Sequence, residues 1–282
     1  MTTSILMPLA KELPSTQVFD ATLWLARELQ AQVQAAYIRP DPAFASIIIP
    51  ETIIAAGVTR ETIELEGRQA AAVAKTGFDE WRRRNGSVQG SGAPGWGASW
   101  ADHVGEFESI ITRSGRLSDF IVLPRPTAGE IVAQRCADAA IFGTGRPTLL
   151  VGGETLPTAL TDHILIAWNG SLEASRAIFG AMPLLRLARR ITIFTALEYG
   201  AEAVDLDELA ASLRNRGIHT PEVVFPTNER STGAALVMAA ETHHATLTVM
   251  GAYTHSRMRE SFLGGVTRHL LAHSPVPLLM SH

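Results

Sequence analysis

The chain has almost no cysteine and no excess of basic charge, and each absence excludes a class of protein. Among its 282 residues the single cysteine is Cys136, which excludes an internal disulfide framework and is typical of a reducing compartment. The 24 basic residues are outnumbered by 28 acidic ones, and the formal charge of −4 gives no bulk attraction for nucleic acid. We therefore expect no nucleic-acid partner.

Long hydrophobic runs are also missing. No apolar stretch approaches the roughly 18–20 residues that a membrane-spanning helix needs. Residues 1–10 lack the basic region that begins a signal peptide. The composition, 46% hydrophobic and 18% charged, is typical of a globular protein. We expect a cytoplasmic protein with no membrane partner.

What the sequence does contain is one pattern of strands and helices that occurs twice. The first half has predicted strands at 4–10, 33–38, 119–124 and 147–153, and a long helix that ends at Asn85-Gly86. Its Gly- and Trp-rich segment 86–105 has no predicted structure. In the second half, strands at 163–168, 191–197, 221–226, 246–252 and 276–281 alternate with helices at 171–190, 205–217, 231–244 and 266–272.

Apolar strands that alternate with helices predict a parallel sheet covered on both faces. Each half is therefore predicted to be a five-stranded, doubly wound α/β domain. The predicted boundaries are 1–153 and 160–282, on either side of a segment with linker composition.

The loop after the strand at 246–252 has the outline of a phosphate-binding turn. Met250-Gly251 ends the strand, and Gly264-Gly265 opens the next helix. Glycine lets backbone N–H groups approach phosphate oxygens, and a helix N-terminus adds a partial positive charge. With these residues, the closing "PVPLLM" and the strand "ILIAWNGS", residues 162–282 resemble the universal stress protein family of the UspA type. The first half shares only the element order and "ILMP".

The resemblance implies a Rossmann-like fold of the HUP/UspA type and an ATP-binding loop with the pattern Gly-x2-Gly-x9-Gly-Ser/Thr. At these four positions this sequence has Gly251, Thr254, Gly264 and Gly265. The implied ligand is ATP or another adenine nucleotide, with magnesium. The implied nucleotide-binding residues are Asn169, Ala196, Met250, Gly251, Thr254, Gly264, Gly265 and Val266.

Several of these residues depart from the family pattern. Thr254 adds a β-branched side chain where the family has glycine, and Gly265 removes a hydroxyl that could donate to a phosphate. Asn169 replaces an Asp that contacts the nucleoside, so a charge-assisted hydrogen bond is lost. Trp168 either stacks on the base or fills its space. We expect the affinity for ATP to be weak or absent; the alternative is a plain strand-to-helix turn in which Ser171 caps the next helix.

The first half departs further from the pattern. Pro124 stands where the second half has Gly251, and Ala10 stands where the family has its Asp. We expect a partner domain without a site. Trp96 and Trp100 are too large to be left exposed, which gives the hypothesis that their segment covers the place where a nucleotide would bind in this half.

Catalytic and metal-binding patterns are not found. The sequence has no Gly-x-Ser-x-Gly elbow, no Walker A pattern and no paired acid and base in one loop. His269 and His273 have the four-residue spacing of zinc ligands, but no third ligand is evident. We expect no catalytic and no metal-binding residues.

Three hypotheses for function follow. In the first, the chain is a tandem stress-response module whose second half binds an adenine nucleotide. In the second, it binds no nucleotide and acts through protein–protein contacts. The third and weaker one is a nucleotide-handling α/β enzyme. The resemblance also implies an intramolecular pseudo-dimer in which the strands at 147–153 and 276–281 meet, with a homodimer as a further option.

Overall fold

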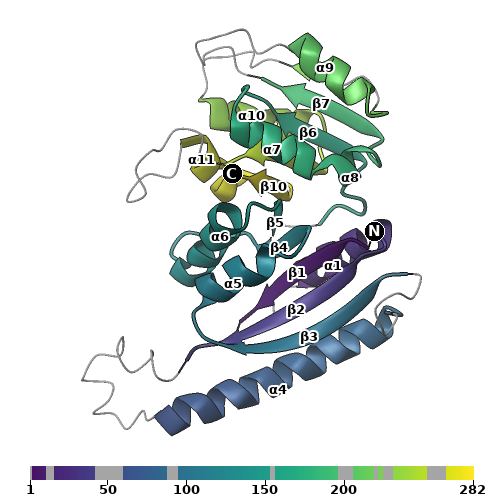
Figure 1. The fold of residues 1–282 in the computed structure, drawn as a ribbon. Coiled ribbons are helices and arrows are strands. Elements are labelled where there is room, and N and C mark those ends of the chain that lie inside the picture. The colour runs from purple at the N-terminus through teal and green to yellow at the C-terminus, as the bar shows by residue number, and fades with distance from the viewer. Residues whose placement is uncertain are drawn as a thin grey trace. The chain divides into compact units, whose positions relative to one another are not determined.

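The computed structural model describes residues 2–10, 16–41, 60–87, 95–152, 156–195, 206–218, 222–224, 231–252 and 265–282. The chain divides into two compact units, Met1–Val122 and Leu123–His282. In each of them, helices pack on a mostly parallel sheet (Figure 1). No helix in the described ranges is both long and apolar enough to cross a membrane.

The first unit is built on four parallel strands in the order β3-β2-β1-β4. Its strands are β1 (Ser4–Leu9), β2 (Gln32–Arg39), β3 (Gly97–Val104) and β4 (Phe120–Pro124), whose last two residues belong to the second unit. Its helices are α1 (Thr16–Glu28), α4 (Arg60–Arg84) and α5 (Phe107–Gly115). As predicted, α4 stops before Asn85-Gly86; Gly86 has φ +67°, which ends a helix without the penalty of a Cβ.

The second unit has the strand order β5-β10-β9-β6-β7-β8. The strands are β5 (Thr148–Val151), β6 (His163–Ala167), β7 (Arg190–Phe194), β8 (Glu222–Val224), β9 (Leu247–Gly251) and β10 (Leu278–Ser281). The helices are α6 (Ile131–Thr144), α7 (Leu172–Gly180), α8 (Met182–Leu185), α9 (Leu206–Arg214), α10 (Thr232–Thr242) and α11 (Gly265–His273). β5 is antiparallel to β10, with Leu149 opposite Leu279. This confirms the predicted contact between the last strands of the two halves.

The α/β fold class is confirmed, and two local predictions need correction. The helix predicted over 171–190 is wrong, because it divides into α7 and α8 at Ala181 and Arg190 already belongs to β7. Pro183 has no N–H to donate to the carbonyl of Phe179, so one continuous α-helix cannot form there. The segment 86–105, left without a prediction, contains the third strand of the first unit, β3.

The predicted domain boundaries differ from the division into compact units. The repeat in the sequence assigns α6 and β5 to the first half. The compact units assign them to the second, since β5 pairs with β10. The boundaries 1–153 and 160–282 therefore stay a prediction.

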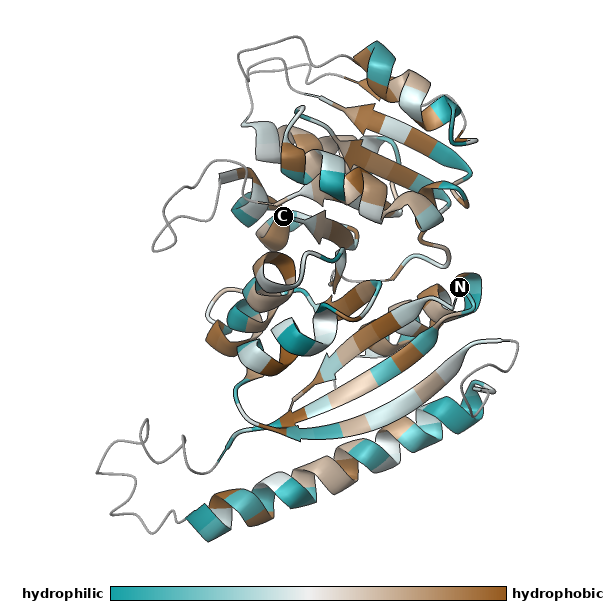
Figure 2. Ribbon diagram, in the orientation of Figure 1, coloured by the Kyte–Doolittle hydropathy of each residue, from teal (hydrophilic) through white to brown (hydrophobic). Residues whose placement is uncertain are grey.

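An aromatic cluster holds α4 on the sheet of the first unit. Phe78 lies at the centre, with ring centroids 5.6 Å from Trp81 and 5.5 Å from Trp100. Trp81 in turn contacts Trp96, and Trp100 stacks on Tyr37. Along α4, hydrophilic and hydrophobic residues alternate (Figure 2), and its buried residues are Ala71, Ala74 and Phe78. The rings therefore supply much of the apolar contact of this helix.

The hypothesis that this segment covers a nucleotide-binding place is wrong for Trp96; residues 42–59 and 88–94 of the segment lie outside the described residues. Gly97 pairs with Gln32, the first residue of β2, so Trp96 lies at the amino edge of the sheet. Ligands of open α/β sheets bind at the opposite, carboxyl edge. Trp96 is 6% exposed because it packs into the aromatic cluster.

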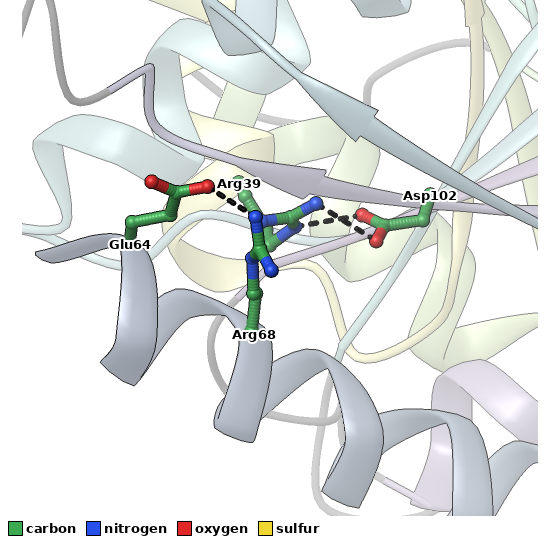
Figure 3. Close-up of polar contacts among 4 residues, drawn as sticks. All are labelled: Arg39, Glu64, Arg68 and Asp102. Atoms are coloured by element: carbon green, nitrogen blue, oxygen red, sulfur yellow. Dashed lines mark hydrogen bonds and ion pairs between the residues drawn. The ribbon is translucent and has the colours of Figure 1, made fainter. Parts of the chain in front are cut away.

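At the carboxyl edge of β2 and β3, Arg39 and Asp102 form a bidentate ion pair (Figure 3). Arg39 Nε and Nη2 donate to the two carboxylate oxygens of Asp102 at 2.9 and 3.0 Å. A further pair, Arg68 and Glu64, lies on the neighbouring turns of α4. The hydrogen bond that Arg39 donates to Asp102 raises the pKa of Arg39. The Arg39 guanidinium is thus charged and already engaged by Asp102.

Removing the central ring of the aromatic cluster should destabilise the protein. Phe78 is fully buried, so we expect Phe78→Ala to lower the free energy of unfolding by about 3–5 kcal/mol in a urea titration. Val73 on the same helix is 70% exposed, so Val73→Ala should change it by less than about 0.5 kcal/mol. Equal effects of the two substitutions would contradict the packing described.

Candidate functional site

Three neighbouring strands of the second unit end together at its carboxyl edge. In the parallel ladder Ala167 lies opposite Met250, and Ser281 lies opposite Gly251. α11 follows β9 and leads into the parallel strand β10, so α11 must begin at this edge. Open α/β sheets bind their ligands here. The described residues that sequence reasoning assigned to a site, namely Asn169, Met250, Gly251, Gly265 and Val266, all lie at strand or helix ends of this edge.

Gly251 lies so close to α7 that no side chain fits. A Cβ built on it would lie 2.5 Å from Ala174 N and 2.7 Å from Glu173 C, both in the first turn of α7. Real Cβ atoms essentially never come within 3.0 Å of another heavy atom. The glycine therefore has a structural role that the sequence pattern did not reveal, because the distance to α7 depends on the fold.

Asn169 is engaged in the turn between β6 and α7. Its Oδ1 accepts a hydrogen bond from Ser171 N at 3.2 Å, and Gly170 between them has φ +74°. Ser171 then caps α7, since its Oγ accepts from Ala174 N at 3.1 Å, as predicted. Because the carbonyl oxygen already accepts one hydrogen bond inside this Asx turn, Asn169 has its amide N–H groups and one remaining acceptor site on that oxygen to offer to a ligand.

Gly265, at the start of α11, has no close neighbour at its Cβ position among the residues that the structure describes. A Cβ built on it would meet no heavy atom within 4 Å. The first N–H groups of an α-helix have no partner within the helix, and they carry the positive end of its dipole. α11 extends over nine residues, Gly265–His273. Among the described residues, a small side chain at Gly265 would therefore meet no atom, and the first N–H groups of α11 lie at the carboxyl edge.

Two side chains near the ends of β6 and β9 affect what this edge can bind. Trp168 follows β6 directly, and its Nε1 is buried without a hydrogen-bond partner in the part of the chain that the structure describes. This burial favours the interpretation in which the indole fills space at the edge. Glu173, in the first turn of α7, contributes an acidic group next to Gly251. A carboxylate there opposes the binding of an anion.

The remaining predicted site residues, Ala196, Thr254 and Gly264, lie outside the described residues.

The histidine pair of α11 has a local structural explanation. The rings of His269 and His273 stack with centroids 4.3 Å apart, and His273 Nδ1 donates to His269 O at 3.0 Å. Burial lowers the pKa of His269, and the neighbouring His273 lowers it further. Within the described ranges no group of three or more His, Cys, Asp or Glu side chains could hold a metal ion.

Sequence reasoning missed a buried histidine at the opposite, amino edge of the same sheet. His163 begins β6 and is 2% exposed. Its Nε2 lies 2.8 Å from Thr192 Oγ1, and its Nδ1 lies 2.8 Å from Arg190 Nη2 and 2.6 Å from His243 O. The one sequence signal was a histidine at the head of an otherwise apolar strand.

Comparison with known proteins assigns the C-terminal part of the chain to a family. The model of the universal stress protein family matches residues 161–282. These residues form a universal stress protein domain. No curated protein sequence matches the chain significantly.

Solved structures extend the fold likeness beyond the universal stress protein domain. A universal stress protein from Archaeoglobus fulgidus DSM 4304 is 16% identical, with 98% of this chain and 97% of that chain covered and a TM-score of 0.72. A functionally unknown protein from Pseudomonas aeruginosa PAO1 is 11% identical, with 99% and 92% covered and a TM-score of 0.60. At these identities the likeness shows the fold alone. A shorter universal stress protein, solved in complex with cAMP, covers 43% of this chain at 24% identity and a TM-score of 0.35.

The contrast between the two glycines of the universal stress protein domain is testable. We expect Gly251→Ala to lower the free energy of unfolding by about 1–3 kcal/mol, because the added methyl group would overlap the backbone of α7. Gly265→Ala, at an open position, should leave it unchanged or raise it by up to about 1 kcal/mol. The free energies of unfolding of the two variants are compared in denaturant titrations. Equal stability of the two variants would show that α7 does not lie against Gly251.

Proposed function

We propose that the universal stress protein domain binds the phosphate group of an adenine nucleotide, with magnesium, at its carboxyl edge, and that it acts as a ligand-dependent module of the stress response rather than as an enzyme. The observation that carries this proposal is the position of the α11 N-terminus, which begins at Gly265 at the edge where β6 and β9 end, with no described atom near the Cβ position of Gly265. Phosphate would accept hydrogen bonds from the N–H groups of Gly265 and Val266. Asn169 would donate to the ribose.

The proposed affinity for ATP is weak, of the order of 0.1–1 mM, which corresponds to about −4 to −5.5 kcal/mol. Three features of the described edge reduce it. Gly265 supplies no hydroxyl, the Asn169 carbonyl oxygen is engaged by Ser171 N, and Glu173 places an acidic group beside Gly251. Trp168 also restricts the space for a base.

Two contacts within the carboxyl edge favour a second candidate function. Gly251 and Asn169 both have structural explanations, the first through its contact with α7 and the second through its Asx turn. A domain that keeps these residues for packing needs no nucleotide. In this case the protein acts through protein–protein contacts alone.

The whole chain is proposed to be a tandem of two such domains, with boundaries at 1–153 and 160–282. The repeated element order and the antiparallel pair of β5 and β10 support this arrangement. In the proposed pseudo-dimer the last strand of each half covers the other's edge, and the first half, which has Pro124 in place of Gly251, has no nucleotide site of its own. A cytoplasmic location is part of the same proposal.

Calorimetric titration of the full chain with ATP and magnesium tests the site. Gly265→Ser adds the family's hydroxyl at an open position and should tighten binding by roughly 2- to 10-fold, the equivalent of one hydrogen bond. Gly265→Asp should abolish the binding heat by charge repulsion. The same Asp at a helix N-terminus should stabilise the fold by about 0.3–1 kcal/mol, so a loss of binding cannot be assigned to unfolding.

Two outcomes would overturn the nucleotide proposal. One is the absence of binding heat at millimolar ATP in both the unaltered chain and Gly265→Ser, which would favour the second candidate function. The other is binding that Gly265→Asp leaves unchanged, which would place the nucleotide elsewhere.

A further inference from the structure

The turn between β6 and α7 contains an asparagine followed by a glycine, a pair in which the asparagine side chain can react with the backbone. In this reaction the main-chain nitrogen of the second residue attacks the side-chain Cγ and closes a succinimide ring. Glycine favours the attack because it has no side chain to hinder its nitrogen. The sequence has two such pairs, and both belong to the tripeptide Asn-Gly-Ser, at 85–87 and at 169–171. Because the following residues are the same, the fold decides how the two pairs differ in reactivity.

At the first pair the fold opposes the reaction. Asn85 follows α4, and its Nδ2 donates to Trp81 O at 2.9 Å, which holds the side chain back along the helix. Gly86 N donates to Arg83 O at 3.4 Å, so the attacking nitrogen has its proton in a hydrogen bond. The carbonyl oxygen of Asn85 also accepts from Arg27 Nη2 at 3.1 Å, which further holds the peptide in place. Both reacting groups of this pair are therefore engaged elsewhere.

At the second pair the fold favours the reaction. Gly170 is exposed, and within the described ranges no group accepts a hydrogen bond from its N–H. Asn169 Oδ1 accepts from Ser171 N at 3.2 Å, and this bond makes Cγ more electrophilic. When Gly170 N adds to Cγ, negative charge develops on Oδ1, where the Ser171 N–H is already directed. A backbone donor aimed at a developing oxyanion lowers the barrier of such an addition.

We propose that Asn169 is a self-modification site, at which the chain converts its own asparagine into a carboxylate by deamidation. Gly170 N bonds to Cγ, the Cγ–Nδ2 bond breaks, and Nδ2 leaves as ammonia with the proton that Gly170 N gives up. Water then opens the ring. Cleavage between Gly170 N and Cγ gives aspartate, and cleavage between Gly170 N and the main-chain carbonyl carbon of Asn169 gives isoaspartate. One water is consumed and one ammonia is released, with no oxidant or reductant.

The modification replaces a hydrogen-bond donor by a negative charge at the carboxyl edge. The amide of Asn169 donates through its N–H groups, whereas an ionised carboxylate only accepts. Ser171 N then donates to a charged acceptor, and the charge lies just before the N-terminus of α7, where the helix dipole stabilises it. A ribose hydroxyl would meet a charge-assisted acceptor here, a consequence that rests on the proposed function. The deamidation itself does not depend on nucleotide binding.

Peptide mass spectrometry of the full chain, incubated for several days at mildly alkaline pH, tests the proposal. Replacement of NH by O raises the peptide mass, so the conversion of Asn85 and of Asn169 is measured in one sample. In the folded chain we expect Asn169 to convert roughly 10-fold faster than Asn85, the equivalent of one or two hydrogen bonds. In concentrated urea the two rates should converge, because the tripeptides are identical. Equal rates in the folded chain would overturn the proposal.

A matched pair of variants tests the part played by the Ser171 N–H. Ser171 has φ −75°, which proline adopts, and proline has no N–H. Ser171→Pro should slow the conversion of Asn169 by roughly 2- to 10-fold, the equivalent of one hydrogen bond. Ser171→Ala also removes the capping hydroxyl but keeps the N–H, so its rate should stay close to that of the unaltered chain.

Equal rates of Asn169 conversion in the two Ser171 variants would show that the N–H does not assist the reaction. The conversion of Asn85 in the same samples checks folding, since loss of the fold should raise it. The comparison of Asn169 with Asn85 in the unaltered chain needs neither variant, so the proposal stays testable if Ser171→Pro does not fold.

Discussion

The absence of a side chain at Gly251 is the constraint on which the geometry of the C-terminal domain depends. It lets the first turn of α7 lie against the end of β9. A Cβ on Gly251 would be only 2.5 Å from Ala174 N in that turn. That contact fixes the turn Asn169-Gly170-Ser171, which leads from β6 into α7 and is closed by two side-chain hydrogen bonds. Since β6 and β9 are neighbours in the sheet, one small residue sets the shape of the edge that a ligand would meet. A glycine at this position is thus required by packing against α7, whether or not a phosphate is bound.

The two units use the ends of their strands differently. In the first, the carboxyl edge of β2 and β3 is closed by the bidentate pair of Arg39 and Asp102, and the aromatic cluster around Phe78 secures the long helix α4. In the second, α11 begins at the carboxyl edge with Gly265, whose Cβ position has no neighbour among the described residues, while the amino edge holds the buried His163. A universal stress protein domain of this kind has donors for an anion at one edge and a titratable contact at the other, with α10 extending between them.

Much of this fold could be predicted from periodicity and turn residues, and the failures have physical reasons. The strands of the second half were placed to within a few residues because each is an apolar run bounded by Gly, Pro or polar residues. β3 was missed because "GASWADHV" has neither an apolar run nor clean alternation, and its place depends on pairing with β2 and packing under α4. The position of the candidate site followed from the family pattern. The second role of Gly251 could not be predicted, because it depends on how closely α7 approaches β9. The contacts of His163 could not be predicted either, since only the folded sheet brings Arg190, Thr192 and His243 close to it.

The central claim is that the carboxyl edge of the C-terminal domain is a weak anion site built on the N-terminus of α11. The most direct measurement is backbone amide NMR of the full chain during addition of ATP with magnesium, with matched sodium chloride additions to correct for ionic strength. The account predicts saturable shifts of the amides of Gly265 and Val266, smaller shifts at Asn169, and none at His163 or Thr192 on the amino edge. Shifts that are absent at millimolar ATP, or that cluster away from α11, would contradict it.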